Sequence, residues 1–322
     1  MEMNSTTPIL YEKKITVAVI DSGLSSLQVN TKIKFSCSLL GDDSIEDGHG
    51  HGTGLVGMLS EFCGNRIEFI IIKVLDDNCR GSSKTLIKAM DIAIDLQPDI
   101  INLSLGTEDM SLRSEFVTKC KLAITKDILL ITTTNENERS LPFILDETIR
   151  IKSSKQIVDT EQLYIDQYST FYTLGIPHIV PWKNGKYVFI NRNSFAPPYF
   201  IRKFLDYKLR NSLNNYSTVT EIKKNCSNIA ELKTKELKFE IPSDFDFYRS
   251  LLEITQRYIP QFEEQKITFA QGLKMNDCID ILVDTEKKFG IKIAFTYFNI
   301  NDFTYISNLS NKINKVLYFH LS

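Results

Sequence analysis

The chain has 322 residues, of which 43% are hydrophobic and 24% are charged, and its formal net charge is −2. These values are typical of a soluble globular protein with enough apolar material for about two domains. No large basic block is present, which argues against a nucleic-acid partner.

The first residues, Met1 to Pro8, are polar, and they show neither a secretory signal nor an apolar run that would span a membrane. We therefore expect a cytoplasmic protein without a membrane partner. The cysteines are scattered without paired spacing, so we expect reduced thiols. They are Cys37, Cys63, Cys79, Cys120, Cys226 and Cys278.

The first half of the chain alternates short apolar runs with segments that have helical spacing. Such alternation predicts a doubly wound, mostly parallel α/β sheet with its chemistry at the carboxyl ends of the strands. The predicted strands are 14–20, 68–75, 99–105 and 128–131, and the predicted helices run from 57 onwards, over 82–95 and over 111–126.

Polar residues follow the predicted strands at three places. Asp21 comes directly after the first strand, where it serves either as a catalytic carboxylate or as a cap for the next turn. The strand Lys186–Ile190 leads to Ser194, and residues 199–209 that follow have helical spacing. A serine at a strand-to-helix junction is exposed at the edge of a sheet and gains from the helix N-terminus.

The stretch from Glu46 to Leu59 places two histidines among glycines, directly before an apolar segment. By itself this pattern suits a catalytic base, a metal loop or a tight turn. A zinc site at His49 and His51 would need further ligands at suitable spacing, and none is evident.

These segments together resemble the subtilisin-like serine peptidases. The matching segments are VAVIDSGL with Asp21, GHGTGLVGML with His51, the run from Ile71 to Gly106, Thr134-Asn135-Glu136, and NSFAPP with Ser194. The resemblance covers roughly 190 residues. The three catalytic segments come in the order Asp, His, Ser, which is the order in subtilisin and differs from that in other serine peptidase folds.

The resemblance implies a role for each matched residue. Ser194 would be the nucleophile, His51 its general base, and Asp21 the carboxylate that holds the imidazole. Asn135 would donate its side-chain amide to the oxyanion. The strand end Ser104, Leu105 and Gly106 would bind substrate.

Two departures from the family pattern affect the pocket for the residue before the scissile bond. Thr134 stands where the family has glycine, and Arg192-Asn193 stand where it has Gly-Thr. We expect a restricted pocket in which Arg192 favours an acidic or polar residue; the alternative is that Arg192 points to solvent.

The last third of the chain is predicted to hold a connector over 207–243, with a strand from Glu236 to Ile241, and then helices over 246–258, 278–289 and 303–316. The run from Gly272 to Ile293 resembles the second helix of acyl or peptidyl carrier domains. The serine that would carry phosphopantetheine is missing, because Lys274 and Met275 occupy its place. The alternative is an unrelated small helical domain.

The sequence therefore predicts a peptidase domain over 1–206, a connector over 207–243 and a carrier-like helical domain over 244–322. We expect an intracellular serine endopeptidase that matures a dedicated peptide or protein, such as the leader peptide of a natural product. The alternative is a catalytically silent scaffold that binds peptide or, through residues 244–322, a biosynthetic partner. We expect no cofactor and no metal, and the sequence offers no support for a calcium site.

Overall fold

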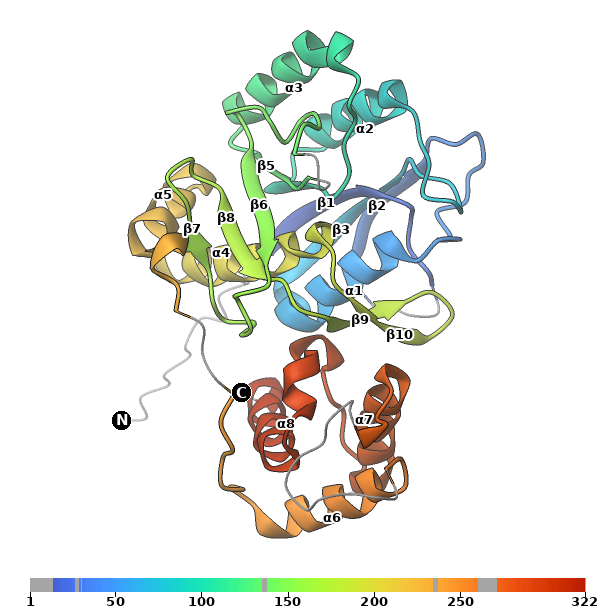
Figure 1. The fold of residues 1–322 in the computed structure, drawn as a ribbon. Coiled ribbons are helices and arrows are strands. Elements are labelled where there is room, and N and C mark those ends of the chain that lie inside the picture. Colours follow the sequence, from blue (N-terminus) through green and yellow to red (C-terminus); the bar gives the residue numbers. More distant parts are fainter. Residues whose placement is uncertain are drawn as a thin grey trace, which may run out of the picture.

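The computed structural model describes residues 14–321 except 27–28, 30, 135–137, 234–236 and 260–270, with side chains described up to Leu317. The larger part of the fold is an α/β unit, and a group of helices from the end of the chain packs below it (Figure 1). No helix in the described ranges is long and apolar enough to cross a membrane.

The centre of the α/β unit is a nine-stranded sheet in the order β11-β7-β8-β6-β5-β4-β1-β3-β2. All neighbours are parallel except β7 and β8, so the predicted doubly wound, mostly parallel sheet is confirmed. The strands are β1 (Ile15–Asp21), β2 (Ile33–Ser38), β3 (Ile67–Lys73), β4 (Ile100–Leu103), β5 (Leu129–Thr132), β6 (Ile149–Ser154), β7 (Tyr164–Ile165), β8 (Phe171–Leu174) and β11 (Ser227–Asn228). A separate hairpin pairs β9 (His178–Trp182) with β10 (Lys186–Ile190).

Helices cover both faces of the sheet (Figure 1). Helices α2 (Ser83–Asp95) and α3 (Arg113–Thr125) lie on one face, and α1 (His51–Cys63) and α4 (Pro197–Asn211) lie on the other. Strand β1 supplies both cores because its side chains alternate: Val17 and Val19 face α1, while Ala18 and Ile20 face α2. The sheet is thereby buried on both sides around the strand that ends at Asp21.

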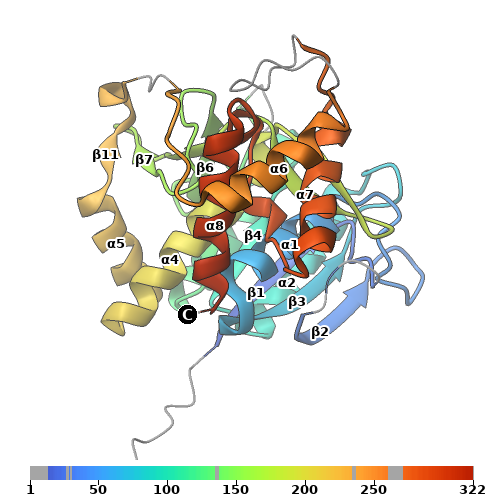
Figure 2. The same cartoon turned by 90° about the horizontal axis from the view of Figure 1, so that it is seen from below.

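The chain after α4 continues as α5 (Asn215–Asn225), β11 and then the C-terminal helices α6 (Phe245–Gln256), α7 (Met275–Phe289) and α8 (Ile306–Leu321). Short 3₁₀ turns at Phe295–Tyr297 (η6) and Ile300–Phe303 (η7) join α7 to α8. Seen from below, these helices lie across the side of the sheet that carries α1 and α4 (Figure 2). The apolar core on that side runs without a break from α1 and α4 into the C-terminal helices.

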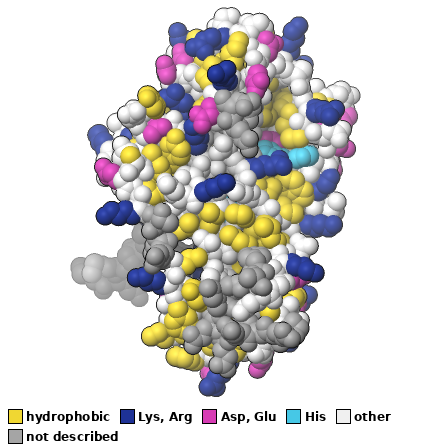
Figure 3. All heavy atoms as spheres, in the orientation of Figure 1, with side chains coloured by type: hydrophobic (Ala, Val, Ile, Leu, Met, Phe, Trp, Pro, Cys, Tyr) yellow, Lys and Arg dark blue, Asp and Glu magenta, His cyan; other side chains and the backbone are white. Residues whose placement is uncertain are grey.

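Backbone hydrogen bonds fasten this C-terminal group to the β9–β10 hairpin. The Ile179 N–H donates to the Phe298 carbonyl at 3.0 Å, and the Ile300 N–H donates to the Pro177 carbonyl at 2.8 Å. Hydrophobic side chains also form a band at the level where the two parts meet (Figure 3). The helices are therefore an integral part of the packing around the hairpin that leads to Ser194.

The predicted strand from Glu236 to Ile241 is wrong in its described part, because residues 237–241 form no strand. Their backbone groups bond instead to two side chains of α8. Asn308 accepts from the Glu240 N–H at 2.9 Å and donates to the Lys238 carbonyl at 2.8 Å, and Asn311 donates to the Ile241 carbonyl at 3.0 Å. The polar backbone of this segment is satisfied by asparagines, so it needs no neighbouring strand.

The C-terminal helices were expected to form a carrier-like bundle, and that resemblance stays a prediction. Lys274, which occupies the place of the missing serine, lies immediately before α7 and bonds through its N–H to Asp277 at 2.8 Å. The boundaries at residues 206 and 243 also stay predictions. Helix α4 continues past residue 206, and α5 packs on it.

Candidate active site

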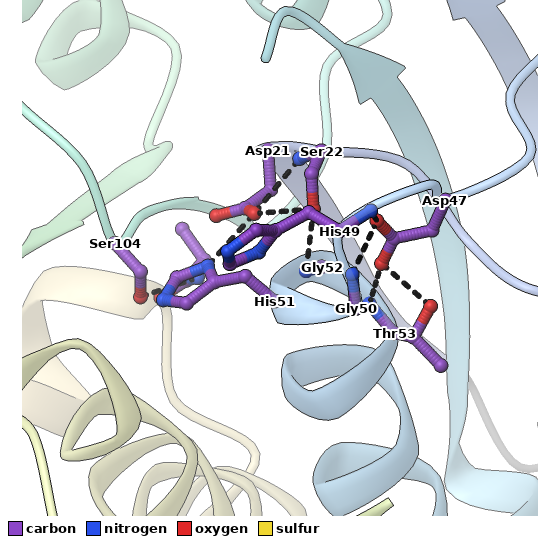
Figure 4. A network of polar contacts seen from close by, with 10 residues as sticks. Asp21, Ser22, Asp47, His49, Gly50, His51, Gly52, Thr53 and Ser104 are labelled. Carbon is purple, nitrogen blue, oxygen red and sulfur yellow. Dashed lines mark hydrogen bonds and ion pairs between the residues drawn. The ribbon is translucent and has the colours of Figure 1, made fainter. Parts of the chain in front are cut away.

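Helix α1 begins at His51, six residues before the predicted start at Gly57, because the residues in front of it form a cap. The buried Asp47 carboxylate accepts the N–H groups of Gly50 at 2.7 Å and Thr53 at 2.9 Å, and the Thr53 hydroxyl at 2.7 Å. Figure 4 shows these bonds beside the two histidines. Gly50 has a φ of 112°, a conformation that favours glycine, and a Cβ there would meet the Trp182 ring at 2.4 Å.

The hydrogen bonds on Asp47 also determine its charge state. Burial alone would raise the pKa of this carboxyl, but the bonds from Thr53 and Gly50 outweigh it and lower the pKa below its ordinary value. Asp47 therefore carries a negative charge at the start of α1, where unsatisfied N–H groups and the helix dipole favour an anion.

His51 is the first residue of α1, and its ring lies against Asp21 at the carboxyl end of β1 (Figure 4). The Nδ1 atom of His51 is 2.8 Å from Oδ1 of Asp21, and both residues are buried. The Ser22 N–H donates to the same oxygen at 2.8 Å. A carboxylate beside Nδ1 places the ring proton there, so Nε2 is left as the acceptor that a general base needs.

The environment of His51 adjusts its basicity. Burial alone would lower the pKa of this imidazole, but the charge and hydrogen bond of Asp21, with the charge of Asp47, outweigh burial and raise the pKa above its ordinary value. The Arg192 cation opposes them and lowers the pKa. The Arg192 cation therefore disfavours protonation of His51.

Ser194 lies on a short 3₁₀ turn, Asn193–Phe195 (η3), between β10 and α4. A residue of β6 and a residue directly after β5 fasten this turn. The Asn193 side-chain oxygen accepts the Ser153 N–H at 2.9 Å and the Ser153 hydroxyl at 2.8 Å, and the Thr133 hydroxyl donates to the Asn193 carbonyl at 3.1 Å. Phe195 packs its ring edge against His51, with ring centroids 4.9 Å apart.

A cleft of about 1000 Å³ brings the predicted site residues together. Its lining includes His51, Ser194, Arg192, Thr134 and the strand end Ser104, Leu105 and Gly106. Asp21 lies behind His51 rather than in the lining. Asn135 lies outside the described residues. Within the described ranges, no hydrogen bond joins His51 to Ser194, although both line the cleft.

Polar side chains line the part of the cleft around Ser104 and Thr134. Ser104 is buried and accepts a hydrogen bond from the Asn102 amide at 3.1 Å. Thr134 is also buried, and its hydroxyl is 3.3 Å from that of Ser140. A Cβ on Gly106 would lie 2.8 Å from the Leu141 carbonyl oxygen, so the chain on that side already touches the strand end. The side chain of Thr134 thus takes up space that a glycine would leave open.

Several residues of the site were not predicted from the sequence. Asp47 offered a signal, since an acidic side chain shortly before a helix can accept hydrogen bonds from its first turn. Ser153 and Thr133 offered none, because their bonds to Asn193 join residues 40 and 60 positions apart. His49 lies beside the site, with its ring centroid 6.3 Å from that of His51 and 5.7 Å from that of Trp182.

Comparison with known proteins decides which family the first part of the chain resembles. Residues 12–143 match the model of the Subtilase family. This segment holds Asp21, His51, Ser104 and Thr134, and it ends before Ser194.

Curated proteases are also similar to part of the chain. The minor extracellular protease Epr of Bacillus subtilis is 30% identical over 142 residues, which are 41% of this chain and 22% of that protease. A subtilisin-like serine protease of Rhodotorula mucilaginosa, Rho m 2.0101, is 29% identical over 35% of this chain and 36% of its own length. Subtilisin of Bacillus pumilus is 30% identical over 29% of this chain and 37% of its own length. The chain thus spans well under half of each of these relatives.

The fold extends the likeness beyond the matched segment. A crystal structure of a cold-adapted subtilisin-like serine proteinase superposes with a TM-score of 0.58 at 16% identity. The superposition covers 69% of this chain and 86% of that proteinase. The α/β unit therefore has a subtilisin-like fold.

Proposed function

We propose that this protein is a serine endopeptidase whose triad is Asp21, His51 and Ser194. The observation that carries the proposal is the 2.8 Å contact between Asp21 and His51 at the edge of a cleft that Ser194 also lines. The match to the Subtilase family and the subtilisin-like fold support it.

In the proposed mechanism, Nε2 of His51 takes the proton of the Ser194 hydroxyl as Oγ attacks the carbonyl carbon of the scissile peptide bond. The Asp21 carboxylate holds the ring and stabilises the imidazolium that forms. His51 then gives the proton to the leaving amine, and water hydrolyses the acyl-enzyme by the same steps in reverse order. By the family resemblance, Asn135 and the Ser194 N–H would stabilise the oxyanion.

The substrate we propose is one dedicated peptide or protein, such as a natural-product leader peptide, processed in the cytoplasm. Support comes from the cleft, in which buried Thr134 and the contact of Gly106 with Leu141 restrict the space for a side chain before the scissile bond. The helices after residue 244 would then serve as a docking module for a biosynthetic partner.

Labelling with a fluorophosphonate tests the proposed activity. We expect the purified chain to form an adduct that peptide mass spectrometry places on Ser194, and we expect Ser194→Ala to form none. Heat-denatured protein is the control for non-specific reaction. Folded wild-type protein that gains no adduct on Ser194 would overturn the proposal.

The second candidate is a catalytically silent scaffold that binds peptide in the same cleft. The observation that favours it is that no hydrogen bond joins His51 to Ser194 in the described part of the chain. Catalytic hydrogen bonds often form only when substrate is bound, so the lack of this bond does not weaken the first candidate. The same labelling experiment separates the two, since the scaffold predicts a folded chain without an adduct.

A further inference from the structure

The described lining of the cleft that holds His51 and Ser194 contains cations and no carboxylate. Arg80, Lys155 and Arg192 belong to its lining, and no Asp or Glu does among the residues that the structure describes. The chain as a whole is slightly acidic, with a formal net charge of −2. The positive charge is therefore a local property of the described lining of the cleft.

These cations are also available to a ligand. All three are exposed, and none forms an ion pair with a carboxylate in the described ranges. Some cations outside the cleft are paired: Lys152 bonds to Glu138, and Arg202 bonds to Glu161. In the described ranges these three side chains thus have no carboxylate as an ion-pair partner, although the Asp76 carboxylate accepts the backbone N–H of Arg80 at 2.9 Å.

The three cations come from separate elements around the cleft. Arg80 is in the loop between β3 and α2, Lys155 follows β6, and Arg192 is two residues before Ser194. A volume of about 1000 Å³ is at the upper end of what ligand sites have, about 300–1000 Å³, so it admits several peptide residues. An extended chain that carries more than one carboxylate would meet cations at more than one place.

We propose that the cleft selects acidic peptides, and that Arg80 and Arg192 are specificity-determining residues that pair with carboxylates of the substrate. This inference deepens the proposed peptidase function and rests on it only for the cleavage step. Arginine suits the role because its planar guanidinium binds a carboxylate through two parallel hydrogen bonds. Lys155 adds to the positive field that draws such a chain into the cleft.

Binding to a silenced full-length chain tests the inference without relying on catalysis. The protein is Ser194→Ala, and the probes are two fluorescein-labelled decapeptides that differ only in carrying glutamate or glutamine at alternate positions. We expect fluorescence anisotropy to show at least about tenfold tighter binding of the glutamate peptide, since a hydrogen bond to a charged group contributes roughly that factor or more. The preference should shrink as salt is raised, because salt screens exposed charges.

Charge variants in the Ser194→Ala background locate the effect. Arg192→Gln and Arg80→Gln should each reduce the preference for the glutamate peptide, and Arg192→Glu should shift it toward a lysine peptide of the same sequence. Lys121→Gln is the matched control, because it removes one exposed cation on α3, away from the cleft. Thermal unfolding confirms that each variant is folded.

Equal affinity for the two peptides would overturn the inference. So would a loss of the glutamate preference in Lys121→Gln as large as that in Arg192→Gln. A third contradicting result is that a fluorescent oligothymidylate of similar charge binds as tightly as the glutamate peptide. The last would indicate a general polyanion surface. Failure here is distinguishable from failure of the proposed activity, which is measured by labelling of Ser194 in the wild-type chain.

Discussion

Asp21 and His51 lie 30 positions apart in the chain, and one hydrogen bond of 2.8 Å joins them in the fold. The bond determines the tautomer of the imidazole, because only a proton on Nδ1 can be donated to the carboxylate. It also holds the pKa of His51 above its ordinary value against the opposing effect of burial. In the proposed mechanism, both effects prepare Nε2 to accept a proton from Ser194.

Replacing Asp21 with asparagine is expected to slow the reaction of Ser194 by about 10³–10⁴-fold. An amide in place of the carboxylate no longer selects the proton on Nδ1, so much of the imidazole takes the wrong tautomer. The measurement is the second-order rate constant for labelling by an uncharged fluorophosphonate. Lys121→Gln is the control, and a loss of less than about tenfold in Asp21→Asn would contradict the triad.

The rate of labelling should depend on pH through His51. Its pKa is raised, and the base acts only when neutral, so labelling should fall on the acid side with a midpoint above the ordinary histidine value of about 6.5. The neighbouring His49 has a lowered pKa, chiefly through burial, so His51 is expected to determine this midpoint.

Arg192→Gln should move the same midpoint to higher pH. The Arg192 cation lowers the pKa of His51, and its removal takes that repulsion away. Labelling rates measured across the pH range check this, with Lys121→Gln as the variant whose midpoint stays in place. A midpoint that moves to lower pH would show that Arg192 does not act on His51 as we describe.

At the scale of elements, the start of α1 determines where His51 stands. The helix begins at His51 because Asp47 accepts hydrogen bonds from its first turn and Gly50 adopts a positive φ. The turn that carries Ser194 is fastened in a comparable way, through Asn193, to Ser153 after the middle of β6. His51 and Ser194 therefore each stand on an element whose end is held by side-chain-to-backbone bonds.

Asp47→Ala is expected to destabilise the protein by about 1–3 kcal/mol and to slow labelling of Ser194. The substitution removes a helix cap and leaves buried N–H groups without an acceptor. Urea unfolding measures the stability. The control is Asn214→Ala, which removes the exposed cap of α5, where Asn214 accepts the Ser217 N–H at 2.8 Å, away from the cleft. That variant should lose stability while its labelling rate stays unchanged.

The Asp47 carboxyl also makes a pH-dependent contribution to stability. Its pKa in the folded chain is below the ordinary value, so its contribution is fully present above the pKa of the unfolded chain and is lost as the pH falls through the folded value. The stability difference between wild type and Asp47→Asn should accordingly shrink in acid. A difference that grows in acid would contradict the assignment.

At the scale of the whole molecule, the C-terminal helices complete the side of the fold that supports the β9–β10 hairpin. Glu61 of α1 is the polar centre of this junction. Its carboxylate accepts the Thr296 N–H at 3.1 Å, the Thr296 hydroxyl at 2.9 Å and the Tyr187 hydroxyl of β10 at 3.0 Å. One side chain thereby joins the helix that begins at His51, the hairpin before Ser194 and the C-terminal group.

Glu61→Ala is expected to lower the free energy of unfolding by about 1–3 kcal/mol. The reason is that the Thr296 N–H, the Thr296 hydroxyl and the Tyr187 hydroxyl lose their acceptor. The rate of backbone amide hydrogen exchange should rise most at residues 293–300. Glu61→Gln keeps an acceptor oxygen and should retain more stability than the alanine variant. Glu221→Gln removes an exposed carboxylate from its pair with Lys224 and should change little. Equal losses of stability in Glu61→Ala and Glu221→Gln would contradict the proposed role of Glu61 in joining these elements.

The amino-acid sequence by itself determined the parallel α/β sheet, and its motifs pointed to Asp21, His51 and Ser194, because strand and helix periodicities and local motifs are written in neighbouring residues. Only the tertiary structure decided what depends on contacts between distant segments. Ser153 meets Asn193 and Glu61 meets Thr296 across 40 and 235 positions, and no local pattern records such pairs. Residues 237–241 alternate like a strand, yet asparagines of α8 satisfy their backbone. The group of cations on the cleft has the same origin, since Arg80, Lys155 and Arg192 share one surface only after folding.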